Sequence, residues 1–469
     1  MKRRDFFRNS ALAAGTALAG PMDLFGKPIV GPRQADRAKN IIFMVSDGMS
    51  LGTLTMADEL RFRKEGFQSH WMSLYRGGLA KRAVMETASA SSLVTDSAAA
   101  SSSWGGGRRV ANGSLNVNAD GSFNKPIWQK FKAAGKAVGC VTTVPITHAT
   151  PAGFCVNSNS RDDQPRIAET YLDLRFDVMM GGGTEFFDGG QRKDKTDLFG
   201  KFIERGFDVV RDRDGLLSAD PAGIAPLLGV FHGDGLPFAL DRDSDPELRR
   251  RIPSLAEMTS TALKRLSANS EGFALQVEGG KVDWAAHAND APALLYDQLA
   301  FDDAVAAAID FADRDGNTLI IITTDHGNAN PGLFYGSKAD ANFDRLQTAR
   351  HTNHWVLNGI TPRSTVAQVI ERIEAACGVA IQPEDAGELL KHYRGADEAG
   401  LYNPRNLPFR ALAGMLERHL SVGWGSMDHS GDFVELAMYG SGSGELMPFV
   451  RNFELHDYML RATGVLTTV

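Results

Sequence analysis

Five short and almost wholly apolar segments recur along the chain, and longer segments with helical patterns lie between them. The apolar segments are residues 40–46, 136–144, 177–182, 272–278 and 318–324. The helical patterns include residues 127–135, 255–268 and 292–314. Apolar strands that alternate with helices are typical of a parallel sheet that is covered on both faces. We therefore predict an α/β fold, a three-layer sandwich in which helices flank a central and mainly parallel sheet.

The pattern changes between about residues 330 and 426. Two helical patterns, one beginning at Thr365 and one at Ala386, are separated by stretches rich in proline, asparagine and arginine. A further strand is predicted at 432–440 and a closing helix at 453–464. We interpret 330–426 as a helical insertion within one domain of residues 38–469, rather than as a separate domain.

The first 30 residues have the pattern of an export signal. An Arg3-Arg4 pair precedes an apolar run of small residues from Ala11 to Ala19, and Ala-Leu-Ala at 17–19 resembles a signal-peptidase site. The segment Arg-Arg-Asp-Phe-Phe resembles a twin-arginine signal, and the alternative is a frayed basic helix. We predict an exported protein, periplasmic or secreted, that folds and acquires any metal before export.

Charge and composition exclude several classes of protein. The formal net charge of −7 leaves no general basic surface for nucleic acid. No apolar run approaches the roughly 18 residues of a membrane span. The three cysteines, Cys140, Cys155 and Cys377, are too few and too scattered for a disulfide framework, and they form no C-x-x-C pair for a thiolate zinc site.

Three of the predicted strands end in an acidic residue that glycine follows, either directly or after one further residue. These acids are Asp47, Glu278 and Asp325, and His326 follows the last of them. Parallel strands bring their carboxyl ends to one edge of the sheet, where ligands bind. Three unpaired carboxylates there would raise one another's pKa, and no lysine or arginine cluster accompanies them in the sequence. We predict that divalent metal binds at this edge, in preference to three unrelated strand-end turns.

A second group of metal-binding residue types follows Glu278. Asp283 and His287 are four residues apart, so on a helix both side chains would project from one face and could hold zinc. A plain surface contact is the alternative for such a pair. His429 lies just before the predicted strand at 432–440, between glycine and serine residues that permit close approach.

The segment at 93–107 contains one candidate nucleophile, Ser97, followed by small residues. The alternative is a tightly packed helix with Asp96 or Ser97 as its N-cap. A helix that begins at Ser97 would direct N–H groups and a favourable dipole at an anion, and a metal can activate a serine without a histidine base. Downstream lie His148, Thr150 and Arg161, and an arginine fork suits a tetrahedral oxyanion.

Six motifs between about residues 39 and 440 resemble, in the same order, those of the alkaline phosphatase family. They are D-G-M at 47–49, T-D-S-A-A at 95–99, H-A-T-P-A at 148–152, V-E-G…D…H at 277–287, T-D-H at 324–326 and D-H-S-G at 428–431. The resemblance implies a mixed α/β sandwich, usually dimeric. It also implies the hydrolysis of small phosphate monoesters with two Zn²⁺ and one Mg²⁺.

The resemblance implies a role for each matching residue. Ser97 resembles the nucleophile that is transiently phosphorylated, and Arg161 the arginine that binds two phosphate oxygens. The implied ligands of one zinc are Asp283, His287 and His429. The implied ligands of the second zinc are Asp47, Asp325 and His326, together with the serine oxygen. The implied ligands of the magnesium are Asp47, Thr150 and Glu278.

Two positions depart from the best-known bacterial form of the family. His148 stands where that form has aspartate, and Trp284 where it has lysine; other members carry these residues. They leave open the occupancy of the third metal site and a water-mediated phosphate contact from position 284. His351 and His354 are expected not to bind metal. The alternative functions are a phosphodiesterase of the same superfamily and a non-catalytic exported protein that binds metal or phosphate.

Overall fold

The computed structural model describes residues 37–220, 223–394 and 406–465. The export signal predicted at residues 1–30 lies outside these residues. Among the helices of the described part, none is both long enough and apolar enough to cross a membrane.

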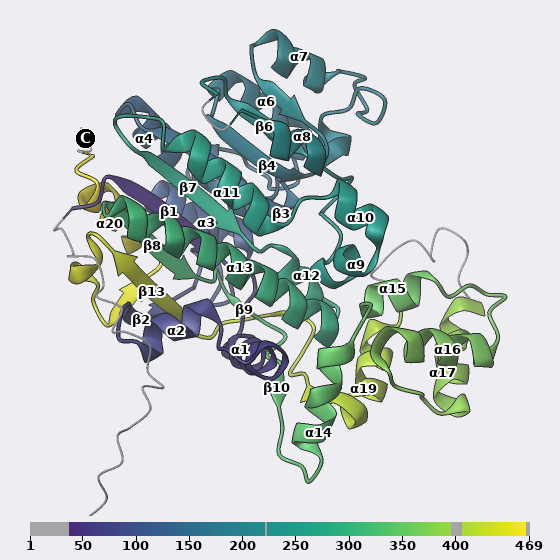
Figure 1. Cartoon of the computed structure of the whole chain (residues 1–469). Coiled ribbons are helices and arrows are strands. Elements are labelled where there is room, and N and C mark those ends of the chain that lie inside the picture. The colour runs from purple at the N-terminus through teal and green to yellow at the C-terminus, as the bar shows by residue number, and fades with distance from the viewer. Residues whose placement is uncertain (1–36, 221–222, 395–405, 466–469) are drawn as a thin grey trace, which may run out of the picture. The chain divides into compact units, whose positions relative to one another are not determined.

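The main element of the fold is a ten-stranded sheet (Figure 1). Its strands, in spatial order, are β14 (Phe449–Arg451), β2 (Lys81–Glu86), β13 (Val434–Gly440), β8 (Thr318–Thr323), β1 (Asn40–Val45), β7 (Phe273–Glu278), β3 (Ala137–Pro145), β4 (Val178–Gly182), β6 (Leu227–Val230) and β5 (Asp208–Val210). Of these ten strands only β13 is antiparallel to its neighbours, β2 and β8. The prediction of an α/β fold with a mainly parallel sheet is confirmed.

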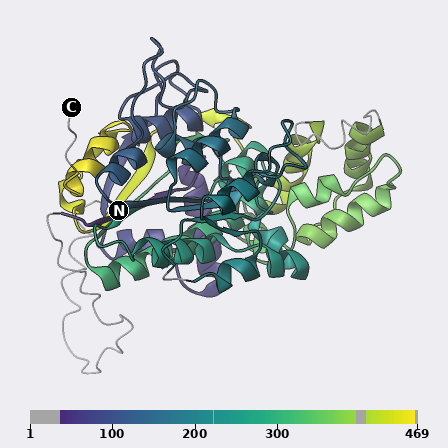
Figure 2. The same cartoon turned by 90° about the horizontal axis from the view of Figure 1, so that it is seen from above.

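Helices cover both faces of the sheet, as Figure 2 shows. In β1, Ile41, Phe43 and Val45 face one hydrophobic cluster, whereas Ile42 and Met44 face the other. The helices on the first face are α3 (Ser97–Gly106), α4 (Ile127–Ala133), α5 (Ala149–Cys155), α6 (Gln164–Leu174), α7 (Leu198–Glu204) and α20 (Glu454–Ala462). Those on the second face are α1 (Leu51–Glu65), α2 (His70–Arg76), α8 (Arg213–Ser218), α10 (Pro246–Arg251), α11 (Leu255–Leu266), α12 (Lys281–His287) and α13 (Ala291–Asp315), and α9 (Ala239–Ser244) packs against α13. Because apolar residues on both sides of a strand are buried, its sequence is continuously apolar.

Four strands of the sheet were not predicted from the sequence: β2, β5, β6 and β14. The pattern of β2 explains one of these omissions. Its Ala83 and Met85 are buried, whereas Lys81, Arg82 and Val84 are exposed, so the segment is half polar. It is the second strand from the edge of the sheet, and only β14 lies outside it. A half-polar strand of this kind lacks the continuous apolar run that identified the central strands.

Residues between 330 and 426 contribute to a third hydrophobic cluster. Its helices are α14 (Ala339–Phe343), α15 (Asn353–Asn358), α16 (Val366–Cys377), α17 (Pro383–Arg394) and α19 (Phe409–Leu420), which lie side by side in Figure 1. The same cluster includes Met56 and Leu60 of α1 and Leu295 and Leu299 of α13. This segment therefore packs on helices of the sheet domain through apolar side chains.

Two of the three cysteines lie together, which the sequence did not indicate. The Sγ atoms of Cys140 on β3 and Cys155 on α5 are 3.7 Å apart, and both residues are fully buried free thiols. The distance is that of two thiols in contact and not of a disulfide.

Candidate active site

The acidic strand ends come from neighbouring strands at the centre of the sheet. β8, β1, β7 and β3 are adjacent and mutually parallel. Asp325 therefore lies beside Asp47, and Glu278 lies on the other side of Asp47. Gly48, with φ of +67°, follows Asp47, and a Cβ at this position would lie 2.4 Å from Oδ1 of Asp283. Glycine is required here for both its backbone conformation and the close approach of α12.

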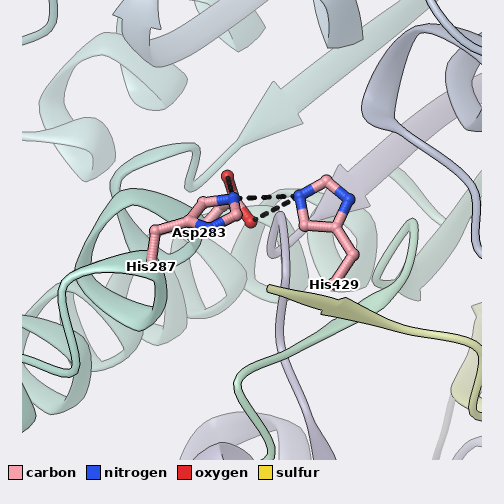
Figure 3. Close-up of side chains that lie close together, drawn as sticks. All are labelled: Asp283, His287 and His429. Atoms are coloured by element: carbon pink, nitrogen blue, oxygen red, sulfur yellow. Dashed lines mark hydrogen bonds and ion pairs between the residues drawn. The ribbon is translucent and has the colours of Figure 1, made fainter. Parts of the chain in front are cut away.

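Asp283, His287 and His429 form the first cluster of candidate metal ligands (Figure 3). The two histidine Nε2 atoms are 3.0 Å apart, and they lie 3.4 and 3.5 Å from the Asp283 carboxylate. Each Nδ1 faces a backbone carbonyl, that of Met427 or that of Thr95, at 2.7 and 3.0 Å. A carbonyl only accepts, so each Nδ1 carries the proton and each Nε2 presents a lone pair. Two lone pairs and a carboxylate that converge in this way are a donor set for a cation.

Asp47, Asp325 and His326 meet beside the first cluster. His326 Nε2 lies 3.2 Å from Asp325 Oδ2 and 3.7 Å from Asp47 Oδ1, and all three side chains are fully buried. Asp283 is close enough to Asp47 and His326 to share a cation with them. The His326 ring stacks on the ring of His429 with 3.6 Å between centroids, so the two clusters are in contact.

A third cluster consists of Asp47, His148 and Glu278. The Thr150 hydroxyl donates to Asp47 Oδ2 at 3.3 Å, which places Thr150 at the same position. The Thr142 hydroxyl donates to Glu278 Oε2 at 2.5 Å and leaves Oε1 without a hydrogen-bond partner among the described residues. The residues implied for the magnesium site thus lie together, and His148 joins them.

Ser97 is the first residue of α3, where its hydroxyl is free to act. The N-cap is Asp96, whose side chain accepts from the Ala99 N–H, so the serine hydroxyl is not needed as a cap. Ser97 Oγ lies 3.4 Å from His326 Nε2, at the second cluster. The small residues of α3 also have a packing role, because a Cβ on Gly105 would lie 1.9 Å from the Gly153 carbonyl oxygen of α5. The nucleophile and the packing interpretations of this segment are compatible.

Arg161 lies between two side chains of the site, Asp96 and His148. Its Nη1 donates to Asp96 Oδ2 at 3.0 Å, and its Nη2 donates to His148 Nε2 at 3.1 Å. Because arginine only donates, His148 accepts on Nε2 and is neutral. Burial, followed by the charge of Arg161, lowers the pKa of His148 to about 3. The Arg161 side chain is 21 % exposed, so an anion can reach it.

The charges of the site require cations. Burial, followed by the charges of Asp325, Asp283 and Glu278, raises the pKa of Asp47 well above its usual range. Burial raises the pKa of Glu278 to about 7. Among the described residues, the buried oxygens Asp47 Oδ1, Asp325 Oδ2 and Glu278 Oε1 have no hydrogen-bond partner. Unpartnered buried carboxylate oxygens are rare in proteins, and divalent ions would satisfy them. The residues present therefore fit the metals implied by the resemblance.

Several residues that position the site were not found from the sequence. Thr142 donates to Glu278, as described above. Asn328 donates to Asp283 Oδ1 at 2.7 Å, and Asp96 holds Arg161. Each contact joins residues that are far apart in the sequence, so no local pattern predicts the contact. His351 and His354 pair with Asp241 and Asp290 and belong to none of the three clusters of the described residues.

The chain is similar to alkaline phosphatases over most of its length. The sequence model of the family described as alkaline phosphatase matches residues 38–465. Alkaline phosphatase 3 of Bacillus subtilis is 29 % identical over 91 % of this chain and 89 % of its own length. Alkaline phosphatase of Escherichia coli is 31 % identical over 66 % of this chain and 74 % of its own length.

A solved structure has the same fold. The crystal structure of Thermus thermophilus alkaline phosphatase matches with a TM-score of 0.85 and 32 % sequence identity, over 96 % of each chain. The match covers both the sheet domain and most of the segment at 330–426. The similarity in sequence and that in structure thus both extend over most of the chain.

Proposed function

The chain belongs to the alkaline phosphatase family, and from that membership we propose a mechanism of hydrolysis through a phosphoserine at Ser97, with two zinc ions and one magnesium ion. A member of this family is a metal-dependent phosphomonoesterase. The proposal is carried by one observation: Ser97 Oγ lies 3.4 Å from His326 Nε2, beside carboxylate oxygens that have no partner among the described residues.

The three clusters would hold the three metals. Asp283, His287 and His429 would hold one zinc. Asp47, Asp325 and His326 would hold the second, and Asp47, Thr150 and Glu278 the magnesium. When bound, the metals would lower the pKa of the attacking hydroxyl and neutralise charge on the phosphoryl group. Hydrolysis of phosphate monoesters is so slow without a catalyst that such charge stabilisation is necessary.

The chain's own residues would carry out two displacements at phosphorus. Ser97 Oγ forms a bond to phosphorus, the ester oxygen departs and takes up a proton, and a phosphoserine results. Water then attacks that phosphorus and releases phosphate and the free serine. Arg161 would hold two phosphate oxygens in its fork, and the N-terminus of α3 would favour the same anion through the helix dipole. Asp96 and His148 set the direction of the guanidinium.

A chelation experiment tests the metal requirement. We expect the purified protein to hydrolyse a chromogenic phosphate monoester, and to lose at least about 99 % of this activity after exhaustive chelation, since oxyanion stabilisation is worth orders of magnitude. Zinc and magnesium should restore it, and elemental analysis should find both metals in the active protein. Full activity in the metal-free protein would contradict the mechanism.

A serine variant tests the nucleophile. We expect Ser97→Ala to retain its zinc and its thermal unfolding temperature but to lose most turnover. Ser103→Ala, six residues along α3, removes only a hydroxyl that donates to the Ala99 carbonyl and serves as the control. Acid quenching with labelled substrate should trap a phosphoenzyme in the wild type and in the control. A wild-type rate in Ser97→Ala with no trapped phosphoenzyme would refute the assignment.

We further propose a homodimer that associates through an apolar patch on the edge of the sheet. The patch consists of Leu51, Val84, Phe433 and Phe449, which are between 38 and 63 % exposed. Phe449 is paired with Val84 and packs against Phe433 with 5.5 Å between ring centroids. Leu51, Val84 and Phe433 also line a cavity of about 480 Å³. A contiguous apolar surface beside a cavity is typical of an interaction site.

We also propose that the protein is exported and that residues 38–469 form one domain with an insertion at 330–426. The Arg3-Arg4 pair and the apolar run after it support export by the twin-arginine route, to the periplasm or beyond. Changing this pair to Lys-Lys should leave the activity inside the cell. For the single domain, scanning calorimetry should show one cooperative transition, and two separate transitions would contradict it.

A further inference from the structure

Lys281 is a buried cation that the proposed mechanism does not use. It is the first residue of α12 and is 6 % exposed. Its backbone N–H donates to Thr143 Oγ1, but its Nζ makes no hydrogen bond or ion pair with any residue that the structure describes. Burying an ammonium without such partners is unfavourable, and a cation at a helix N-terminus opposes the helix dipole. The charges of Asp297, Asp234 and Asp241 offset part of these costs, and contacts with aromatic rings offset more.

Two aromatic rings surround this ammonium. Lys281 Nζ lies 3.8 Å from the ring centroid of Phe238 and 4.2 Å from that of Trp284. Both distances are well within the range of a cation–π interaction, which is strongest with tryptophan and in desolvated sites. Lys281 and Trp284 are three residues apart on α12, so they lie on one face of the helix. The ammonium therefore holds the indole ring in place.

The backbone of Gly235 confines the same ring. A Cβ on Gly235 would lie 3.1 Å from an atom of the Trp284 ring and 3.3 Å from Lys281 Cδ. The loop before α9 thus packs against both side chains, and Phe238 belongs to the same loop. This packing and the contact with the Lys281 ammonium together limit the positions open to the Trp284 ring.

Trp284 in turn contacts His148, and His148 contacts Arg161. The rings of Trp284 and His148 are in an edge-to-face contact, with 6.3 Å between centroids and 76° between planes. On the far side of His148, its Nε2 accepts from Arg161 Nη2 at 3.1 Å. A continuous series of contacts therefore runs from Lys281 through Trp284 and His148 to Arg161.

We propose that Lys281 is a positioning residue for phosphate binding. Its ammonium holds Trp284 against His148, and His148 then fixes the direction in which the Arg161 guanidinium meets the substrate. The inference rests on the proposed role of Arg161. It predicts an effect on the binding of phosphate rather than on the attack by Ser97, because Lys281 touches neither the nucleophile nor a ligand cluster.

The test measures phosphate affinity in the metal-loaded enzyme. For Lys281→Met we expect the Kd for inorganic phosphate, measured by calorimetry, and the KM for a chromogenic monoester to rise about tenfold, which is the scale of a desolvated cation–π contact. The kcat should change less than about threefold. A residue that positions Arg161 affects the binding of the substrate and of the transition state alike, and such a loss raises KM rather than lowering kcat. Lys281→Arg keeps the cation and should recover most of the affinity.

The matched control is a second lysine that lies over an aromatic ring. Lys64 Nζ is 4.4 Å from the ring centroid of Tyr296 and also bonds to its hydroxyl, on the surface and away from the site. Lys64→Met should leave Kd, KM and kcat unchanged. Lys281→Gln removes the charge but keeps a polar end to the side chain, and is measured in parallel. A folded Lys281→Gln protein with wild-type phosphate affinity would overturn the inference.

A double-variant cycle separates this inference from the proposed function. If Lys281 acts through Arg161, adding Lys281→Met to Arg161→Ala should not weaken phosphate binding further. An equal loss in both backgrounds would show that Lys281 acts by another route and would refute the inference alone. If Arg161→Ala itself binds phosphate as the wild type does, the role of Arg161 in the proposed function fails first.

Discussion

At the scale of single residues, we expect Arg161 to determine the preference for monoesters over diesters. A monoester has three non-bridging oxygens, two of which the guanidinium fork can hold, whereas a diester has only two in total. We expect Arg161→Ala to lower kcat/KM for a phosphate monoester about a hundredfold and that for a diester much less. Rates on both substrates decide this, with the exposed Arg250→Ala as control. Equal wild-type efficiency on the two classes would show that the enzyme is not specific for monoesters.

His456, which lies next to α3, makes the free energy of unfolding depend on pH. Burial, followed by the charge of Lys130, lowers the pKa of His456 to about 4. The unfolded chain takes up this proton near pH 6.5, so the contribution is complete above about pH 6.5 and is lost as the pH falls toward 4. We expect His456→Gln to reduce the slope of unfolding free energy against pH in this window by up to about 1.4 kcal/mol per pH unit. Urea unfolding of the metal-free proteins measures both slopes, and parallel curves would contradict the assignment.

At the scale of elements, the close packing of α3 against α5 fixes where Ser97 on α3 lies relative to Thr150 on α5. A Cβ on Gly105 would overlap the Gly153 carbonyl, whereas a Cβ on Gly414 of α19 would meet nothing within 4 Å. We expect Gly105→Ala to destabilise the protein by about 1–3 kcal/mol through overpacking and to reduce activity. Gly414→Ala should stabilise it by up to about 1 kcal/mol. Both are measured by urea unfolding, and effects of the same sign would contradict the packing argument.

At the scale of the whole molecule, we expect the apolar patch proposed above to determine the oligomeric state. Phe433→Asp places a charge in the centre of the proposed interface, where its burial would be strongly unfavourable. We expect this variant to be monomeric by light scattering at concentrations where the wild type is a dimer. The control is Ile203→Asp, at an apolar residue that is 60 % exposed on α7. A monomeric wild type would refute the proposal.

The sequence by itself was sufficient to predict the α/β fold and the central strands. It also indicated which acids and histidines are candidate ligands. These features depend on local order: a continuous apolar run predicts a strand buried on both faces, and the spacing of Asp283 and His287 predicts one helix face. The family resemblance supplied the assignment of ligands to individual metals. The half-polar strand β2 was missed because its pattern is not continuous.

Only the tertiary structure decided which residues support the site. Thr142 meets Glu278 because β3 and β7 are paired in a particular register, and Asn328 meets Asp283 through contacts between a strand and a helix. The place of Lys281 between Phe238 and Trp284 depends on a loop more than 40 residues earlier. Such contacts result from the packing of distant segments, and no short pattern encodes them. The direction of Arg161, and with it the proposed choice of substrate, is set by contacts of this kind.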